Sequence, residues 1–163
     1  MIKRMMPYIL VTVFFLLDCT VLPMLTSAWF VPVFSLALVH VLGLLMGRSR
    51  GVLLGLISGL LMDISSSTPL GRMTIICVLL AYTGGLFGRY LRSLRPIFTV
   101  MISAAVSFAL YELFMDAYVI FSSAQYNGTL FLHSLVRVPI YVGLTLGLRH
   151  ALRNAVPPAP VRT

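Results

Sequence analysis

The chain has 163 residues, of which 60% are hydrophobic and only 10% charged, and its mean hydropathy is +1.02. Soluble domains are about half apolar and about a quarter charged. This composition therefore excludes a cytosolic enzyme, a disordered regulator and a secreted domain stapled by disulfides. The length indicates one domain, with room for about six or seven transmembrane helices of roughly 20 residues each.

The charge balance is strongly basic, with 12 Lys and Arg residues against 4 Asp and Glu and a net charge of +8. A nucleic-acid-binding surface needs a basic face exposed to water, and a chain this apolar has no solvated domain to carry one. The basic residues instead stand in small groups between apolar runs, which is typical of a topology signal and of contact with anionic lipid headgroups. We therefore expect membrane lipids, and no nucleic acid, among the partners.

Few residues offer chemistry of their own. Cys19 and Cys77 lie inside apolar runs without CxxC spacing, which favours small buried hydrophobic residues over a disulfide or metal pair. His40, His133 and His150 share no metal-ligand spacing, and neither a phosphate-binding loop nor a nucleophile triad is present. We expect His40 to be a hydrogen-bonded core histidine and His150 a cation at a helix end. The sequence predicts no catalytic residue, no metal and no cofactor.

Charged breaks and breaks rich in Pro, Gly or Ser divide the chain into six continuous apolar segments. A segment that crosses a membrane as a single chain is helical, because only then are its backbone groups satisfied within it. We predict one transmembrane domain over residues 1–156, followed by a short flexible tail over the Pro-rich residues 157–163. The predicted helices lie near Pro7–Leu22, Trp29–Gly47, Gly51–Ile64, Met73–Phe87, Ile97–Phe121 and Leu130–His150.

The third segment is the shortest. Its apolar core reaches only about 21 Å at 1.5 Å per residue, whereas the hydrocarbon core of a bilayer is about 30 Å thick. It ends at Asp63, and small hydroxyl residues followed by Pro69 and Gly71 then predict a turn. We expect this turn to lie at or just below membrane level, covered by neighbouring helices.

The positions of the basic residues alternate along the chain. All but two of the 12 stand before the first segment, between the second and third, between the fourth and fifth, or at and beyond the end of the sixth; the exceptions are Arg72 and Arg137. By the positive-inside rule both termini are expected in the cytoplasm. The first segment also has the outline of a cleaved signal peptide, but Asp18 interrupts it and cleavage would leave an odd number of spans.

All four acidic residues lie within or at the ends of apolar segments. A charge there costs about 2.5–3.5 kcal/mol on insertion scales, so each needs a partner or a water-filled cavity. For Asp18 and Asp63, near the predicted outer ends, internal pairing or an interfacial helix end is favoured over an ion pathway. Glu112 and Asp116 share one helix face, and we predict a buried charge cluster of these two with Arg137 that joins the last two segments.

Glycines recur at every fourth position in three segments. Successive members of such a row rotate by only about 40°, so they form one ridge along the helix. A glycine ridge lets two helix backbones approach closely, either inside the bundle, which is favoured, or against another subunit. The glycines predicted to serve helix packing or partner contact are Gly51, Gly55 and Gly59, then Gly84 and Gly88, and finally Gly143 and Gly147.

The stretch Gly55–Asp63, followed by Pro69–Gly71 and Leu80–Tyr82, resembles the MreD family of bacterial rod shape-determining inner-membrane proteins. In that family a short glycine-ridged helix ends in an aspartate, a turn with a glycine follows, and the next helix carries a tyrosine. The motif residues that match are Gly55, Gly59, Asp63, Gly71 and Tyr82.

The matched residues have physical roles that the sequence leaves partly open. Gly71 would supply a tight turn. Asp63 is able to cap that turn by accepting hydrogen bonds from the backbone of residues 65–67, or to pair with Arg72. The charge at Arg72 is a departure from the family pattern, and it could equally reach outward to a partner.

The resemblance implies a non-enzymatic scaffold or regulator of the cell-elongation complex in the bacterial inner membrane. It implies MreC as main partner and, through MreC, the MreB filament, together with the glycan polymerase RodA and its class B penicillin-binding transpeptidase. Such a protein would help couple peptidoglycan synthesis to the cytoskeleton and so maintain rod shape.

The family is also similar in fold to the substrate-binding subunits of energy-coupling-factor transporters. The expected fold is therefore a compact all-α bundle of six transmembrane helices. The same similarity gives an alternative function, a substrate-capturing membrane subunit of such a vitamin transporter. That alternative predicts a ligand cavity lined by the intramembrane acids and His40.

Overall fold

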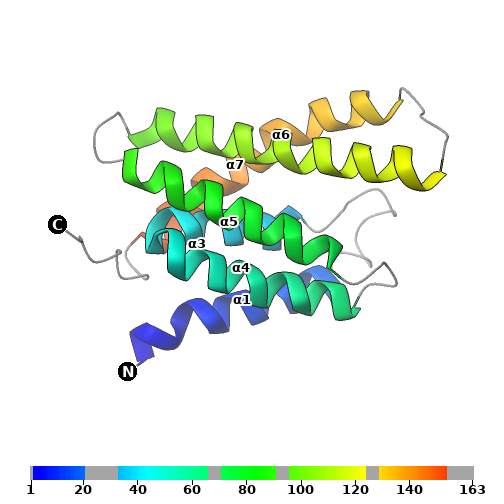
Figure 1. The fold of residues 1–163 in the computed structure, drawn as a ribbon. Coiled ribbons are helices and arrows are strands. Elements are labelled where there is room, and N and C mark those ends of the chain that lie inside the picture. Colours follow the sequence, from blue (N-terminus) through cyan, green and yellow to red (C-terminus); the bar gives the residue numbers. More distant parts are fainter. Residues whose placement is uncertain (1, 21–32, 66–70, 91–95, 124–128, 154–163) are drawn as a thin grey trace.

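The computed structural model describes residues 2–20, 33–65, 71–90, 96–123 and 129–153, and the side chains within 6–20, 34–65, 71–89, 97–117 and 138–153. The described part of the chain is helical apart from short turns (Figure 1). Its helices are α1 (Ile2–Thr20), α3 (Val33–Met46), α4 (Arg48–Ser65), α5 (Arg72–Tyr90), α6 (Pro96–Ser123) and α7 (Thr129–Leu152).

Each predicted segment corresponds to one of these helices, which confirms the all-α architecture. Two helices begin three or more residues earlier than expected, α1 at Ile2 and α4 at Arg48. The prediction treated the basic residues there as breaks, but Lys and Arg are good helix formers and extend the first turn. The reversal between α3 and α4 needs only Gly47, whose φ of 82° lies in the left-handed region that favours glycine. The predicted tail, 157–163, lies outside the described residues.

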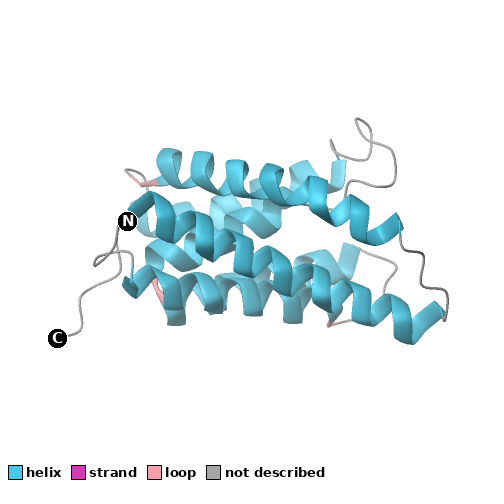
Figure 2. Ribbon diagram, turned by 90° about the horizontal axis from the view of Figure 1, so that it is seen from above, coloured by secondary structure: helices cyan, strands magenta, loops and turns pink. Residues whose placement is uncertain are grey.

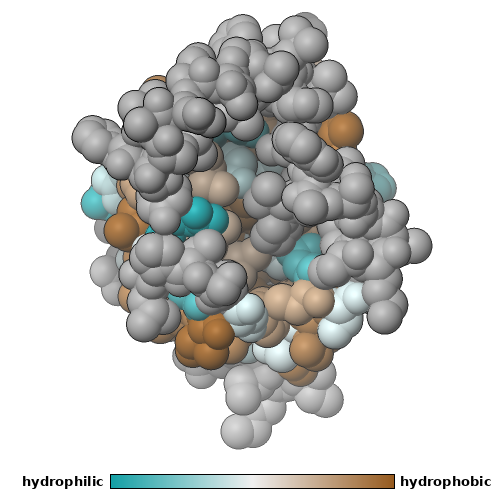
Figure 3. All heavy atoms as spheres, turned by 90° about the vertical axis from the view of Figure 1, so that its right-hand side faces the viewer, coloured by the Kyte–Doolittle hydropathy of each residue, from teal (hydrophilic) through white to brown (hydrophobic). Residues whose placement is uncertain are grey.

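The helices run back and forth along one bundle (Figures 1 and 2). The start of α1 and the end of α7 lie at one end, whereas the ends of α1, α4 and α6 meet the starts of α3, α5 and α7 at the other (Figure 1). We call the first of these the basic end, because Arg48, Arg50, Arg89 and Arg153 lie there. Figure 3 views the opposite end, where the described residues present both hydrophobic and hydrophilic side chains.

Helix α3 lies at the centre of the bundle and packs against α1, α4, α5 and α7. Every side chain from Ser35 to Leu44 is buried, as expected of a helix that is apolar all round. Phe108 of α6 and Tyr141 of α7 pack against each other in the core, with ring centroids 5.0 Å apart and ring planes tilted by 40°. The core thus holds α6 and α7 against the α3–α5 layer.

Among the described helices, only α6 is by itself long and apolar enough to cross a membrane. The span Ile97–Ala117 has 21 residues, a mean hydropathy of 1.9 and 39% of its residues buried. Met6–Thr20 and Phe34–Met46 are apolar but shorter. Large apolar side chains such as Ile64 and Leu113 are exposed, which is the surface that lipid covers in a membrane protein. Six complete spans remain a prediction.

Candidate functional site

The carboxylate of Asp63 joins the end of α4 to the start of α5. Its side chain is 1% exposed. Oδ2 accepts hydrogen bonds from the backbone N–H of Gly71 at 2.9 Å and Thr74 at 3.0 Å, and from the Thr74 hydroxyl at 2.6 Å. Oδ1 accepts from the Met73 N–H at 2.9 Å. The first N–H groups of a helix have no partner within the helix, so Asp63 caps α5 from the preceding helix.

Sequence reasoning did not anticipate these donors. It pointed to the N–H groups of residues 65–67, of which 66 and 67 lie outside the described residues, or to Arg72, the half-buried first residue of α5. The N–H groups at the start of α5 converge and carry the positive end of the helix dipole, which favours a carboxylate there. Gly71 has a φ of 100°, which agrees with the tight turn expected at this glycine.

Asp18 joins α1 to α3 in a similar way. It lies near the end of α1 with 7% exposure, and its Oδ2 accepts a hydrogen bond from the Ser35 N–H in the first turn of α3 at 2.8 Å. Asp18 and Asp63 therefore each cap the next described helix, at the end of the bundle away from the basic end. Both contacts agree with the interpretation that these acids are held internally.

The glycine ridge of α4 lies inside the bundle. A Cβ built on Gly55 would lie 2.7 Å from the Cys77 carbonyl oxygen, and one on Gly51 would lie 2.7 Å from the Gly43 Cα. A Cβ on Gly59 would collide with the Thr74 Cα. Real Cβ atoms essentially never come within 3.0 Å of another atom, so only glycine permits this contact between α4 and its neighbours.

The other two ridges differ from one another. On α5, a Cβ on Gly84 would lie 2.5 Å from the His40 carbonyl oxygen and one on Gly88 would lie 2.6 Å from that of Leu44, so this ridge packs against α3. On α7, no atom of the described residues lies within 4 Å of a Cβ built on Gly143 or Gly147. The ridges of α4 and α5 serve internal packing, and that of α7 is open.

His40 is the centre of a buried polar network. Its Nδ1 lies 3.2 Å from the Leu80 carbonyl and 3.1 Å from the Ser107 hydroxyl, and its Nε2 lies 3.3 Å from the Ser103 hydroxyl. The Thr83 and Ser107 hydroxyls are 2.9 Å apart. The network joins α3, α5 and α6, and it confirms the prediction of a hydrogen-bonded core histidine.

Replacing His40 by leucine is expected to lower the free energy of unfolding by about 2 kcal/mol, because the substitution removes the ring's hydrogen bonds while keeping most of its volume. Ser103 keeps its bond to the Val100 carbonyl, so its hydroxyl is not left unsatisfied. Chemical unfolding in detergent micelles measures the loss, and Thr12→Val on the exposed face of α1 is the control. Equal stability of His40→Leu and the wild type would mean that the network adds nothing to the fold.

The predicted charge cluster is only partly described. Glu112 and Asp116 lie half-buried on α6, and Arg137 lies in α7, but the side chain of Arg137 is outside the described residues. The cluster therefore stays a prediction.

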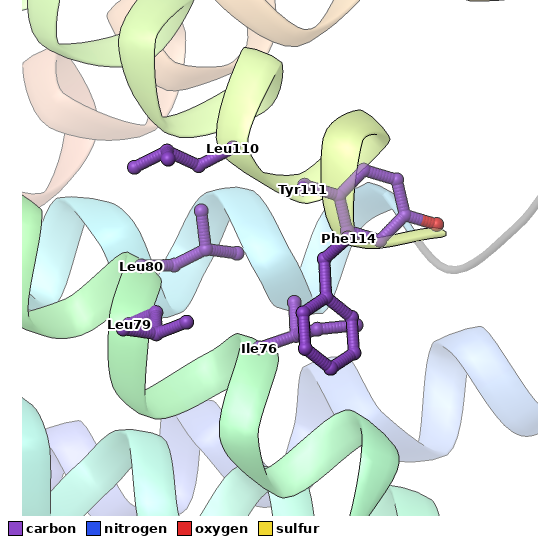
Figure 4. A pocket seen from close by; sticks show the side chains of 6 residues that line it. All are labelled: Ile76, Leu79, Leu80, Leu110, Tyr111 and Phe114. Atoms are coloured by element: carbon purple, nitrogen blue, oxygen red, sulfur yellow. The ribbon is translucent and has the colours of Figure 1, made fainter. Parts of the chain in front are cut away.

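A shallow apolar recess lies between α5 and α6 (Figure 4). Its cavity volume is about 10 Å³, roughly the space of one water molecule, and none of its lining side chains is an acid or a histidine. The vitamin-sized cavity of the transporter alternative stays a prediction. The lining residues are Ile76, Leu79, Leu80, Leu110, Tyr111 and Phe114.

Tyr82, a motif residue to which the sequence assigned no role, lies beneath an arginine at the basic end. The guanidinium carbon of Arg48 is 4.2 Å from the centre of the Tyr82 ring, within the distance of a cation–π interaction. Among the motif residues, Asp63 and Gly71 lie at one end of the α4–α5 pair and Tyr82 lies toward the other. Gly55 and Gly59 lie along the contact between the two helices.

Comparison with protein families extends the resemblance to nearly the whole chain. The family model described as rod shape-determining protein MreD matches residues 1–149. This chain belongs to the MreD family. Membership confirms the resemblance carried by Gly55–Tyr82 and assigns the protein to rod shape determination and to the inner membrane. No curated protein and no solved structure matched the chain, so the likeness of this MreD-family fold to energy-coupling-factor subunits stays a prediction.

Proposed function

We propose that this MreD-family protein is a non-enzymatic membrane scaffold of the rod complex and that MreC is its main partner. It holds the single transmembrane helix of MreC against α7. Through MreC it helps couple RodA and its class B penicillin-binding transpeptidase to the MreB filament. Family membership supports the role in rod shape, and the open glycine ridge of α7 supports the contact.

The open face of α7 suits a partner helix. Pro139, Gly143, Gly147 and Ala151 follow one another at intervals of four residues, and all four are exposed. Small residues at this spacing leave a shallow groove in which a second helix backbone can lie closely. The ridges of α4 and α5 are already filled by neighbouring backbone, so a partner cannot use them without separating the helices.

In the proposed topology, residues 1–156 form one domain with six spans and both termini in the cytoplasm. The basic end holds five described arginines, Arg48, Arg50, Arg89, Arg149 and Arg153. Asp18 and Asp63 lie at the other end. Positive charge is retained on the cytoplasmic side of the membrane, which supports placing the basic end there. MreC would then cross the membrane alongside α7.

The proposal predicts that leucine at both Gly143 and Gly147 will lower the recovery of MreC in a detergent pull-down by about tenfold or more, because bulky side chains block close helix approach. Ala109→Leu, an exposed small residue on α6, is the matched control and should leave recovery unchanged.

The folded state of each variant is checked by thermal unfolding, since α7 is open at both glycines and no loss is expected. Full recovery of MreC by the double variant would exclude the open face of α7 as the MreC contact. Recovery of an ATPase module or a bound vitamin in place of MreC would favour the transporter alternative.

A further inference from the structure

The exposed face of α5 forms an apolar stripe that ends in positive charge. Ile75, Leu79, Tyr82, Leu86 and Arg89 follow one another at intervals of three or four residues and so share this face. Ile75 is 50% exposed and Leu79 is 44% exposed. The stripe lies between α4 on one side and α6 on the other (Figure 1).

Arg48 is held over this stripe by two contacts. Its guanidinium stacks on the Tyr82 ring at 4.2 Å. Its backbone lies directly against α5, since a Cβ built on Gly85 would come within 2.6 Å of the Arg48 Cα. A stacked guanidinium keeps its N–H groups in the ring plane, free to donate in pairs to an anion. Arg48 is thereby oriented before any ligand arrives.

Arg48 and Arg89 form a positively charged corner of the bundle, at the basic end of α4 and α5. These two charges have no acidic partner in the described part of the chain. Arg48 and Arg89 are exposed and form no ion pair with any described residue. The described acids lie elsewhere, Asp18 and Asp63 at the opposite end and two more in the second half of α6. The corner therefore presents uncompensated positive charge to whatever covers it.

The recess between α5 and α6 lies at the inner end of the same stripe. Its distance from Arg89 matches the thickness of one lipid leaflet. Leu79 belongs both to the stripe and to the recess lining, to which α6 contributes Leu110 and Phe114 (Figure 4). From Arg89 to Leu79 the helix rises by about 15 Å at 1.5 Å per residue, and the Arg48 guanidinium over Tyr82 lies between these two levels. One leaflet of a bilayer has about the same hydrocarbon thickness, half of roughly 30 Å.

We propose that this face of α5 binds an anionic phospholipid. Arg48 and Arg89 hold the lipid phosphate, one acyl chain lies along the stripe past Tyr82, and its end reaches the recess at Leu79. An acidic protein segment would match the arginines, but it would not match an apolar stripe that runs inward from them. The inference rests on the membrane location that the family assigns and is independent of the proposed contact with MreC on α7.

The test is native mass spectrometry of the purified full chain, titrated in detergent with dioleoyl-phosphatidylglycerol or dioleoyl-phosphatidylcholine. We expect tighter binding of the anionic lipid, and a loss of affinity of about tenfold for Arg48→Gln and for Arg89→Gln. Tyr82→Phe keeps the ring and should keep binding, whereas Tyr82→Leu should lose it. Arg153→Gln, at an exposed arginine just past the end of α7 at the same end of the bundle, is the charge-matched control.

A second variant tests the acyl chain separately. Leu110→Trp fills the recess without changing charge and should weaken both lipids by a similar factor. Equal binding of the two lipids by the wild type, or equal losses for Arg153→Gln and Arg48→Gln, would overturn the proposal. So would displacement of the lipid by millimolar inorganic phosphate or by a polyglutamate peptide. Thermal unfolding of each variant separates loss of binding from loss of fold.

Discussion

Asp63→Ala is expected to lower the free energy of unfolding by about 4 kcal/mol, because hydrogen bonds to a buried carboxylate stabilise by about 1.5–3 kcal/mol each and are not fully additive. The N–H of Gly71, just before α5, and two N–H groups and one hydroxyl in the first turn of α5 donate to this side chain. Without it, the first turn of α5 loses its cap and leaves donors unsatisfied at a buried position.

A graded series separates the cap from a general effect of mutation. Thr74→Val removes one donor and should cost about 1.5 kcal/mol. Asp63→Asn should cost about 2 kcal/mol, because its amide oxygen can replace Oδ2 while its NH₂ group meets the Met73 donor. Denaturant unfolding of all three variants in the same micelles ranks their losses of unfolding free energy. If Asp63→Ala unfolded at the same denaturant concentration as the wild type, the cap would not stabilise the α4–α5 pair.

The same substitution is expected to have opposite signs at Gly84 and Gly143. Gly84→Ala should destabilise by about 3 kcal/mol, the upper end of overpacking costs, since its Cβ would meet the His40 carbonyl at 2.5 Å and backbone cannot rotate away. Gly143→Ala meets no atom of the described residues within 4 Å. It should stabilise by up to about 1 kcal/mol, the difference in helix propensity.

Thermal unfolding of both variants in one detergent measures the two shifts relative to the wild type. Gly55→Ala on α4 should behave like Gly84→Ala on α5, and Gly147→Ala like Gly143→Ala on α7, so that the closed ridges and the open ridge are each tested by two variants. Destabilisation of similar size at Gly84 and Gly143 would contradict the division of the ridges into closed and open ones.

Local patterns were sufficient to predict the helices and the rows of glycine. Apolar runs interrupted by Gly, Pro and charge located every described helix, with the largest error at the start of α1, where Lys and Arg were taken as a break. A row of glycines indicates that a helix has a close-packing face, but the residue across that face comes from another segment. Gly55 and Gly143 therefore look alike in sequence, although one meets Cys77 and the other meets nothing in the described chain.

The site contacts were harder to predict for the same reason. The donors to Asp63 lie 8 to 11 residues away, across a turn whose geometry is not encoded in any single residue. Gly85 is outside the regular ridges, yet it is where α5 meets the backbone of Arg48. Tyr82 was indicated by the family motif, and only the packing of α4 on α5 brings an arginine onto its ring.

Site-specific photo-crosslinking in living cells tests the scaffold proposal most directly. A photoreactive amino acid at position 143 or 147 places the probe on the open ridge of α7, and one at 109 or 117 places it on the exposed face of α6. We predict adducts with MreC from the two α7 positions and none from the two α6 positions. Adducts from α6 alone, or no MreC adduct from α7 in cells that contain MreC, would contradict the proposal.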